Sequence, residues 1–411
     1  MSLLRSISTI AGSSIISQVI GAVSIWLISD RYGMAEVGIY ALTYSIVLIG
    51  AQVCTFASQL LLPKQSEEHL AQNLVFCLLQ SLLLAVPFTA VVVVLFERPF
   101  VLFYLLTVLH AWVLISENLL LRDEKMSLLA IQRISMSVIV VSSIFFSSQA
   151  QMFYWHWAVV SLSCISLWLF YSMPFQHMRW KLWGWRENHR FFQQHRHHIS
   201  RVGSAEVLAM ANNNLPMVLI NFWFSSVTAG YFAIVSRFCL SPVVIVGNAV
   251  RNSIFSKWSV DFRHQRFHFA EFVRVRKLLL ILGSLATAGV FVCYPLVMDF
   301  AYAQQWVSHE WVESVPTSRY MLPYLFPALA VCPLTVIELV FGSPRYFLRI
   351  QFEQLAVVVV AFVVLPYFIP DYGLSVLAFA LLSALRYGFI YLKVNQRANL
   401  LRKQEEAKHA Q

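Results

Sequence analysis

The sequence predicts an all-α integral membrane protein with about 12 transmembrane helices. Three observations predict this class. The chain is 59% apolar and only 12% charged, whereas roughly 25% charged residues is typical of a soluble domain. Apolar segments of about 20 residues, each long enough to cross a bilayer core, recur from Ile7 to Leu392. Most of the 30 Lys and Arg residues lie in every second connection, on the side of the N-terminus.

The predicted spans are apolar runs separated by short polar or charged breaks. They are residues 7–29, 38–62, 70–96, 101–121, 127–146, 155–173, 202–224, 230–254, 278–300, 320–341, 352–369 and 374–392. The first run is too long for the apolar core of a signal peptide, so we expect it to stay as an uncleaved anchor. An even number of spans, with basic residues in alternate connections, predicts that both termini are cytoplasmic.

Composition also excludes several functions. The net charge of +10 does not indicate nucleic-acid binding, because the basic residues lie in short loops on one side, where they orient helices. The six cysteines fall inside apolar spans without CxxC spacing, so we expect neither disulfides nor a metal site. A His-rich connection at 189–198 lacks acidic or thiol partners and is interpreted as a solvated basic linker.

The two halves of the chain resemble each other. Residues 7–13 are similar to 199–204, and residues 37–42 are similar to 229–234. Six spans per half is an even number, so both halves enter the membrane in the same orientation, as a parallel repeat. The predicted organisation is an N-terminal six-helix bundle at 1–176, a basic cytoplasmic linker at 177–200, a C-terminal six-helix bundle at 201–392 and a cytoplasmic tail at 393–411. The tryptophans of the linker predict that it lies along the membrane surface.

Polar stripes follow some of the spans. Side chains with hydroxyl, amide or aromatic groups recur at helical spacing in the first and second spans, where the candidate contacts are Gln18, Tyr40 and Tyr44. The seventh span carries three consecutive asparagines, Asn212, Asn213 and Asn214, which are further candidate contacts. Two interpretations remain open for the stripes, tight helix packing and a water-accessible lumen. Pro216, which follows the asparagine run, frees a backbone carbonyl and suits a bent helix beside a cavity.

A charged side chain inside a membrane span costs free energy unless it forms an ion pair or is hydrated. Arg237 lies about 10 Å from the outer end of its span at 1.5 Å per residue. Three roles are open for it: an anion contact in the lumen, an ion pair with an acid such as Glu206 or Glu338, or extension of the side chain to the interface. Arg251 and Arg386 lie nearer the cytoplasmic end, where they either bind an anion or extend to the interface. Glu117, Glu206 and Glu338 are candidate sites for a coupling proton.

No catalytic constellation is found, so an enzyme is not expected and no cofactor is implied. The chain has no Gly-rich phosphate loop followed by Lys, so ATP-driven transport is not expected. No large outer loop carries paired Arg or carboxylate residues, which argues against the alternative of a membrane sugar polymerase. A drug or organic-cation exporter is the other alternative; such a protein needs a deep carboxylate, whereas the deepest charge here is Arg237.

Several segments resemble one family in order and spacing across nearly the whole chain. They are Gly12-Ser13 with Gln18, Arg31-Tyr32-Gly33, Val37-Gly38-Ile39-Tyr40-Ala41, Leu62-Pro63-Lys64 with Glu67-Glu68, residues 121–133, Leu215-Pro216, residues 229–233, Ser236-Arg237 and residues 372–387. These segments are similar to the oligosaccharide flippases, the Wzx type, of the superfamily of multidrug and oligosaccharidyl-lipid exporters. The lumen cations are fewer than in some relatives, with Arg237 and Arg386 the main ones.

The resemblance implies a V-shaped pair of six-helix bundles around a cationic central cavity that works by alternating access. It also implies a lipid-linked oligosaccharide on undecaprenyl diphosphate, flipped across the inner membrane of a bacterium for O-antigen or another surface polysaccharide of the lipopolysaccharide type. The implied partners are this substrate, membrane lipids, and the polysaccharide polymerase with its chain-length machinery; nucleic acid is not among them. The residues agree with this reading, because Arg binds diphosphate bidentately and Tyr and Asn side chains suit a sugar chain.

Overall fold

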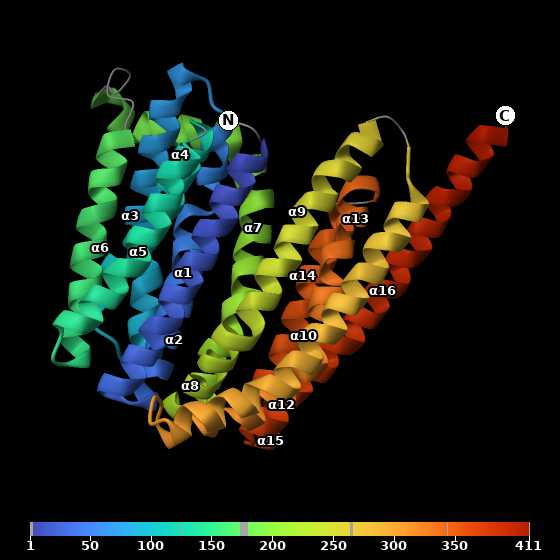
Figure 1. The fold of residues 1–411 in the computed structure, drawn as a ribbon. Coiled ribbons are helices and arrows are strands. Elements are labelled where there is room, and N and C mark those ends of the chain that lie inside the picture. The colour runs from blue at the N-terminus through green and yellow to red at the C-terminus, as the bar shows by residue number, and fades with distance from the viewer. Residues whose placement is uncertain (1–2, 124, 173–179, 264–265, 343, 411) are drawn as a thin grey trace. The chain divides into compact units, whose positions relative to one another are not determined.

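A computed structural model describes residues 3–123, 125–172, 180–263, 266–342 and 344–410 of the chain. Every regular element in these ranges is a helix, as the sequence predicts (Figure 1). A helix satisfies its own backbone hydrogen bonds, which a chain inside hydrocarbon requires. Within the same ranges, ten helices are long and apolar enough to cross a membrane, or 11 if the bent pair His309–Ala330 and Cys332–Glu338 counts as one span. The protein is therefore a multi-pass membrane protein.

One predicted span, 202–224, is not among those helices. It forms the second part of α7, Trp185–Trp223, where Asn212, Asn213, Asn214 and Asn221 lower the hydropathy. A twelfth span therefore stays a prediction.

The helices group into two compact units. The first contains Met1–Glu36 and Tyr40–Val218, and the second contains Val37–Ile39 and Leu219–Gln411. The predicted boundary at 176–177 lies in residues 173–179, outside the described ranges. The predicted boundary at 200–201 lies inside the continuous helix α7. The division into two bundles of six spans remains a prediction.

The first unit is built from α1 to most of α7. Its elements are α1 Leu3–Tyr32, α2 Met34–Thr55, η1 Ser58–Lys64, α3 Glu67–Phe96, α4 Phe100–Arg122, α5 Met126–Phe146, α6 Ala150–Ser172, η3 Trp180–Trp183 and α7. Helix α1 packs along α5, and α4 packs against α3 and α6. Leu74 of α3 and Ile115 of α4, both fully buried, lie in the same apolar core.

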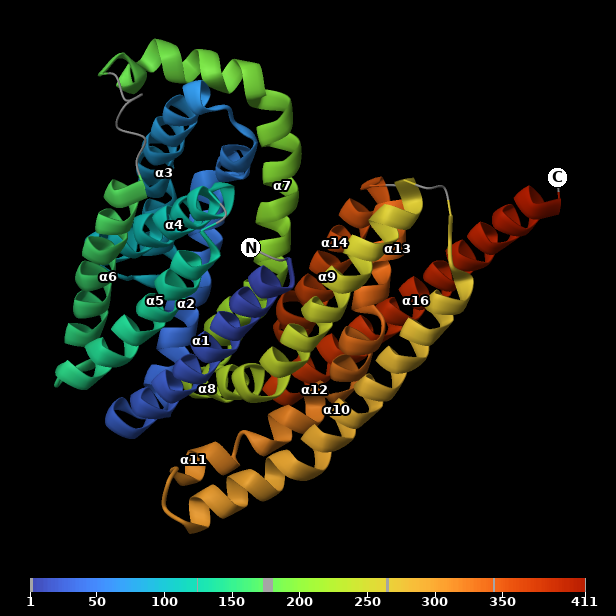
Figure 2. The ribbon, with the colours of Figure 1, turned by 45° about the horizontal axis from the view of Figure 1, so that its top comes forward.

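The first part of α7 crosses the end of this unit before the helix turns, as Figure 2 shows for the segment that passes over α3. Phe191 is 2% exposed, and its ring lies 5.0 Å from the ring of Phe76 in α3. Further along, Gly203 lies against Phe56: a Cβ at Gly203 would be 2.5 Å from Phe56 Cδ1. These contacts explain why the predicted linker segment and the following residues group with the first unit.

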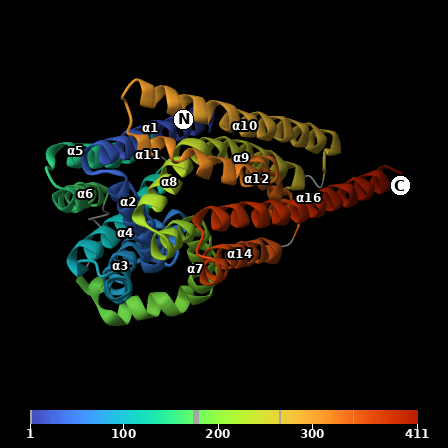
Figure 3. The ribbon, with the colours of Figure 1, turned by 90° about the horizontal axis from the view of Figure 1, so that it is seen from below.

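The second unit contains more helix breaks. Its elements are α8 Ser226–Val235, η4 Ser236–Leu240, α9 Ser241–Arg263, α10 Phe269–Ala303, α11 His309–Val312, α12 Val315–Ala330, η5 Cys332–Thr335, α13 Val336–Phe341, α14 Pro344–Val359, η6 Val360–Val364, α15 Leu365–Phe368 and α16 Tyr372–Ala410. Helix α10 packs against α12, α12 packs against α16, and α14 runs beside α16 (Figure 3). The bend between α12 and α13 follows Pro327 and Pro333, which cannot donate backbone hydrogen bonds.

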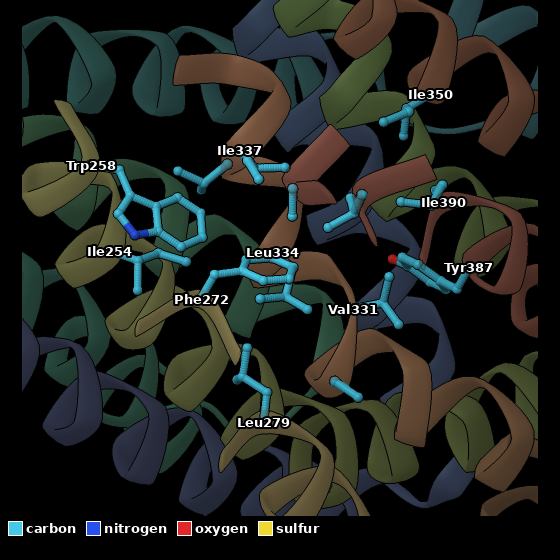
Figure 4. Packing of buried hydrophobic residues seen from close by; sticks show 14 of the residues in the cluster. Ile254, Trp258, Phe272, Leu279, Val331, Leu334, Ile337, Ile350, Tyr387 and Ile390 are labelled. Atoms are coloured by element: carbon cyan, nitrogen blue, oxygen red, sulfur yellow. The ribbon is translucent and has the colours of Figure 1, made fainter. Parts of the chain in front are cut away.

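A large apolar core holds the second unit together. Figure 4 shows Trp258 of α9, Phe272 of α10 and Leu334 of η5 packed with neighbours from α13, α14 and α16. Trp258 and Phe272 are 1% and 0% exposed, so the core excludes solvent at the break between α12 and α13. Helix α16 runs on through the predicted tail, because residues 393–410 are rich in helix formers and Arg402 pairs with Glu406 one turn later at 2.7 Å.

Candidate functional site: a buried arginine and an aromatic cluster

Among the described residues of the second unit, Arg386 is a buried cation. It lies on α16 and is 9% exposed. Its Nη1 donates to the carbonyl oxygen of Ile350 in α14 at 3.1 Å, and its guanidinium carbon lies 4.6 Å from the centroid of the Tyr387 ring. Within the described ranges no carboxylate forms a salt bridge with it, and its Nε is buried without a hydrogen-bond partner. A buried guanidinium with only neutral partners is suited to an anion, because an uncompensated buried charge is costly.

A second cation, Arg251, belongs to the same region of the second unit. Arg251 is half-buried on α9, and both α9 and α16, the helix that carries Arg386, pack against η5. The structure therefore brings two of the three predicted arginines to the break between α12 and α13. Arg237, the third, lies half-buried in η4, a π-helical turn between α8 and α9. Single π-turns inside α-helices occur frequently at functional sites.

Glu338 belongs to this region but has its own partner. It lies on α13, is 8% exposed, and its Oε1 is 3.6 Å from Nε of Arg397 on α16. The carboxylate thus compensates Arg397. The two proposals made for Glu338 from the sequence, a partner for Arg237 and a site for a coupling proton, remain untested predictions.

In the first unit the predicted tyrosines form part of an aromatic cluster. The ring of Tyr40 in α2 lies 6.1 Å from Tyr44 and 5.7 Å from Trp157 of α6. Tyr44 is 36% exposed and also stands edge-on to His110 of α4 at 5.6 Å. Trp157 and His110 were not predicted from the sequence. The position of a histidine inside the apolar run 101–121 is the sequence signal that could have identified His110.

The remaining amides have different surroundings. Gln18 is half-buried on α1. In α7, Asn212 is buried, Asn213 is exposed, and Nδ2 of Asn214 donates to the carbonyl oxygen of Met210 at 2.9 Å. The asparagine run therefore does not form one uniform polar face, because the amide of Asn214 is used within its own helix.

The two other predicted acids also differ from each other. Glu117 of α4 accepts from Arg133 of α5 through both carboxylate oxygens, at 2.7 and 3.1 Å. Glu206 is exposed on α7. The structure thus supplies a strong partner for Glu117, while the role of both acids in coupling stays a prediction.

The predicted contacts are divided between the units. Gln18, Tyr40, Tyr44 and Asn212–Asn214 belong to the first unit, whereas Arg237, Arg251 and Arg386 belong to the second. The first unit offers aromatic and amide groups, and the second offers guanidinium groups. Among the described side chains, no group of three or more His, Cys, Asp or Glu residues is placed to hold a metal ion.

The described residues thus form a polytopic helical protein with a buried arginine in a membrane-spanning helix. No family model matches the chain, and no curated protein matches it. Solved structures do. The fold is similar to an inward-facing multidrug resistance transporter of the MATE family in the MOP superfamily, at 13% identity and a TM-score of 0.71, covering 94% of this chain and 96% of that one.

Two further solved structures have the same fold. The lipid II flippase MurJ, in an inward closed conformation, matches at 12% identity and a TM-score of 0.73, covering 97% of this chain and 90% of that one. The MATE multidrug transporter DinF-BH matches at 12% identity and a TM-score of 0.67, with 97% of each chain covered. The chain therefore has the helical fold of MOP-superfamily transporters, which include both flippases and drug exporters.

Proposed function

We propose that this protein is a flippase that moves a lipid-linked oligosaccharide, carried on undecaprenyl diphosphate, across the inner membrane of a bacterium by alternating access. The observation that carries the proposal is Arg386, whose guanidinium is buried in a membrane-spanning helix. It donates a hydrogen bond to a backbone carbonyl and lies over an aromatic ring. A diphosphate would supply the anion that this environment lacks. Arg is suited to it because its planar fork binds phosphate oxygens in pairs.

The distribution of charge supports an anionic substrate over a cationic drug. An exporter of organic cations needs a carboxylate that is free to meet its cargo. Glu338 and Glu117, two carboxylates with little exposure in the described spans, are paired with Arg397 and Arg133. The fold similarity to MurJ supports a lipid-linked cargo, and the similarity to MATE transporters keeps drug export as the competing outcome.

The aromatic cluster of the first unit fits the other part of such a substrate. Sugar rings pack their apolar C–H faces against aromatic rings, and their hydroxyls need hydrogen-bonding partners. Tyr44 offers a part-exposed ring beside Tyr40 and His110. The aromatic cluster, taken by itself, therefore suits a sugar chain.

The proposal is tested in a strain that lacks the gene. We expect the deletion to accumulate an undecaprenyl-diphosphate oligosaccharide, identified by mass spectrometry, and to lose surface polysaccharide. Wild-type protein and Arg276→Gln should restore export, because Arg276 already bonds Asn395 Oδ1 at 2.5 Å. Arg386→Ala, expressed at normal level, should not. No lipid-linked intermediate in the deletion strain, together with dye efflux by the purified protein in liposomes, would replace the flippase with a drug exporter.

A further inference from the structure

Helix α2 ends in an unusual break inside the first unit. The helix stops at Thr55, and the next two residues, Phe56 and Ala57, have φ values of 43° and 60° before the chain continues as η1. Left-handed backbone at non-glycine residues costs about 1–3 kcal/mol each. Such strain persists where the surroundings hold it and is concentrated at binding sites.

Polar groups from three elements, α2, η1 and α3, meet at this break. The carbonyl oxygen of Thr55 accepts from Ser58 Oγ at 2.6 Å and from Gln80 Nε2 of α3 at 2.9 Å. Cys77 Sγ lies 3.4 Å from Ser58 Oγ and 3.5 Å from Asn73 Oδ1. Thr55, Ser58, Asn73 and Cys77 are all 0% exposed, and Gln80 is half-buried.

Four side-chain atoms of this region are buried and make no hydrogen bond to any described residue. They are Oε1 of Gln59, Oε1 of Gln80, Nε2 of Gln52 and Nδ2 of Asn73. Gln52 and Gln59 are 4% and 2% exposed. Each unmade hydrogen bond of a buried polar atom costs about 1–3 kcal/mol. Because side-chain oxygen and nitrogen exchange places when an amide rotates by half a turn, Gln52 and Asn73 can also present oxygens here.

We propose that the break binds a monovalent cation of the Na⁺ type, in a site formed by Gln52, Thr55, Ser58, Gln59, Asn73 and Gln80, named here the α2-break site. Amide, hydroxyl and backbone oxygens are the ligands that hard cations prefer. The C-terminal end of a helix carries partial negative charge, and broken helices in transporters bind Na⁺ with freed backbone carbonyls. A site without carboxylates suits a monovalent ion over Mg²⁺ or Ca²⁺.

The α2-break site is separate from the residues proposed to bind the substrate. Neither the aromatic cluster nor the arginines of the second unit belong to it, so the proposal does not rest on the identity of the cargo. A bound Na⁺ would satisfy the two amide oxygens that lack donors, Gln59 Oε1 and Gln80 Oε1. It would also give the transporter a place where a sodium gradient acts on the helix break.

The test uses the purified full-length protein in detergent. Thermal unfolding is followed in NaCl, LiCl, KCl and choline chloride at equal ionic strength. We expect Na⁺ to raise the midpoint in a saturable way that choline does not reproduce, because a ligand that binds only the folded state stabilises it. Gln59→Leu should abolish this Na⁺-dependent shift. Gln132→Leu is the matched control: Gln132 is 0% exposed in the first unit, close to the 2% of Gln59, and its Oε1 accepts from Ser116 Oγ at 3.0 Å, so its loss should leave the shift intact.

A second variant keeps the test decisive if Gln59→Leu does not fold. Gln59→Glu adds a carboxylate of the same shape, and ligand charge tightens cation sites, so the Na⁺ concentration for half-maximal stabilisation should fall by about tenfold. A wild-type protein with no Na⁺-specific shift overturns the proposal. So does a shift that is unchanged in both Gln59 variants, because the α2-break site then holds only water. Flipping of the lipid-linked substrate is measured separately, so either proposal can fail alone.

Discussion

Arg133 of α5 holds both carboxylate oxygens of Glu117 of α4, with Nε at 2.7 Å from Oε1 and Nη2 at 3.1 Å from Oε2. The side chains are 29% and 19% exposed, so the pair lies mostly out of solvent and joins two neighbouring helices of the first unit. An arginine that binds both oxygens of a carboxylate forms two parallel charge-assisted hydrogen bonds, which fix the relative position of the two helices. The geometry of Glu117 therefore fits a structural role.

The first prediction follows from this pair. Glu117→Gln should destabilise the protein by about 1–3 kcal/mol, because Arg133 loses its counter-charge while it remains part-buried. The measurement is the thermal midpoint in detergent. The double variant Glu117→Gln/Arg133→Gln should recover most of the loss, since two neutral amides can bond each other. An unchanged midpoint in Glu117→Gln, combined with loss of a pH response in transport, would instead assign Glu117 to proton coupling.

The second prediction concerns Arg237 in the π-helical turn η4. If Arg237 binds the diphosphate, Arg237→Ala should abolish polysaccharide export at normal protein levels, and Arg237→Lys should recover only part of it, because an ammonium lacks the planar fork. Export and membrane abundance are measured together in the complemented deletion strain. A structural ion pair would give the opposite pattern, lower abundance of Arg237→Ala that is restored when the partner acid is neutralised. Normal export by a stable Arg237→Ala protein contradicts the diphosphate role.

The third prediction concerns the packing of α7 on the first unit. Gly203→Val should lower stability by about 1–3 kcal/mol, because its Cβ would meet the side chain and the backbone oxygen of Phe56; the distances would be 2.5 and 2.6 Å. Gly289→Ala in α10 is the control, since nothing lies within 4 Å of the position of its Cβ. That control should be neutral or slightly stabilising. Equal midpoints for the two variants would mean that α7 does not approach Phe56 this closely.

The fourth prediction concerns the end of α3. Glu97 caps this helix in the left-handed conformation, with φ 52° and its N–H donating to the Val93 carbonyl oxygen at 2.9 Å. Glycine adopts this conformation without steric cost, so Glu97→Gly should raise stability by about 1 kcal/mol. Glu97→Ala removes the same charge but keeps the Cβ, so it should give no such gain. Thermal midpoints of the two variants side by side measure the difference.

The apolar runs were sufficient to predict most of the helices, because a span needs only length and hydropathy. What they could not predict is which way each helix faces. The stripe in the second span that ends with Thr55, Ser58 and Gln59 fitted a water-accessible lumen as well as helix packing. The structure buries all three inside the first unit, at 0%, 0% and 2% exposure. The amino-acid composition of the segment is the same whichever way its polar face points. Only the packing of α3 and α4 against it decides whether these side chains are buried or face a lumen.

The sequence also could not predict which side chains pair with each other across different helices. Glu338 and Arg397 lie 59 residues apart in sequence, taken as 397 minus 338, and pair only because α13 and α16 meet. The aromatic cluster around Trp157 likewise joins α2, α4 and α6. Buried Arg386, by contrast, was identified from the sequence, because a charge inside an apolar run is conspicuous whatever its neighbours are. Its role as an anion contact stays a proposal.

The long helix α7 has a consequence for how the protein is made. Phe191 and Gly203 complete the packing around Phe76 and Phe56, yet they leave the ribosome long after α1 to α6 have been synthesised. During that interval the turn at Phe56 lacks its contacts with α7, and the helices around it are in the membrane without that packing. A nascent chain stalled before Phe191 would therefore expose this surface to membrane proteases and insertion chaperones, and one from which Val218 has already emerged would not. Biogenesis of the first unit is thus complete only when the ribosome has already begun the second.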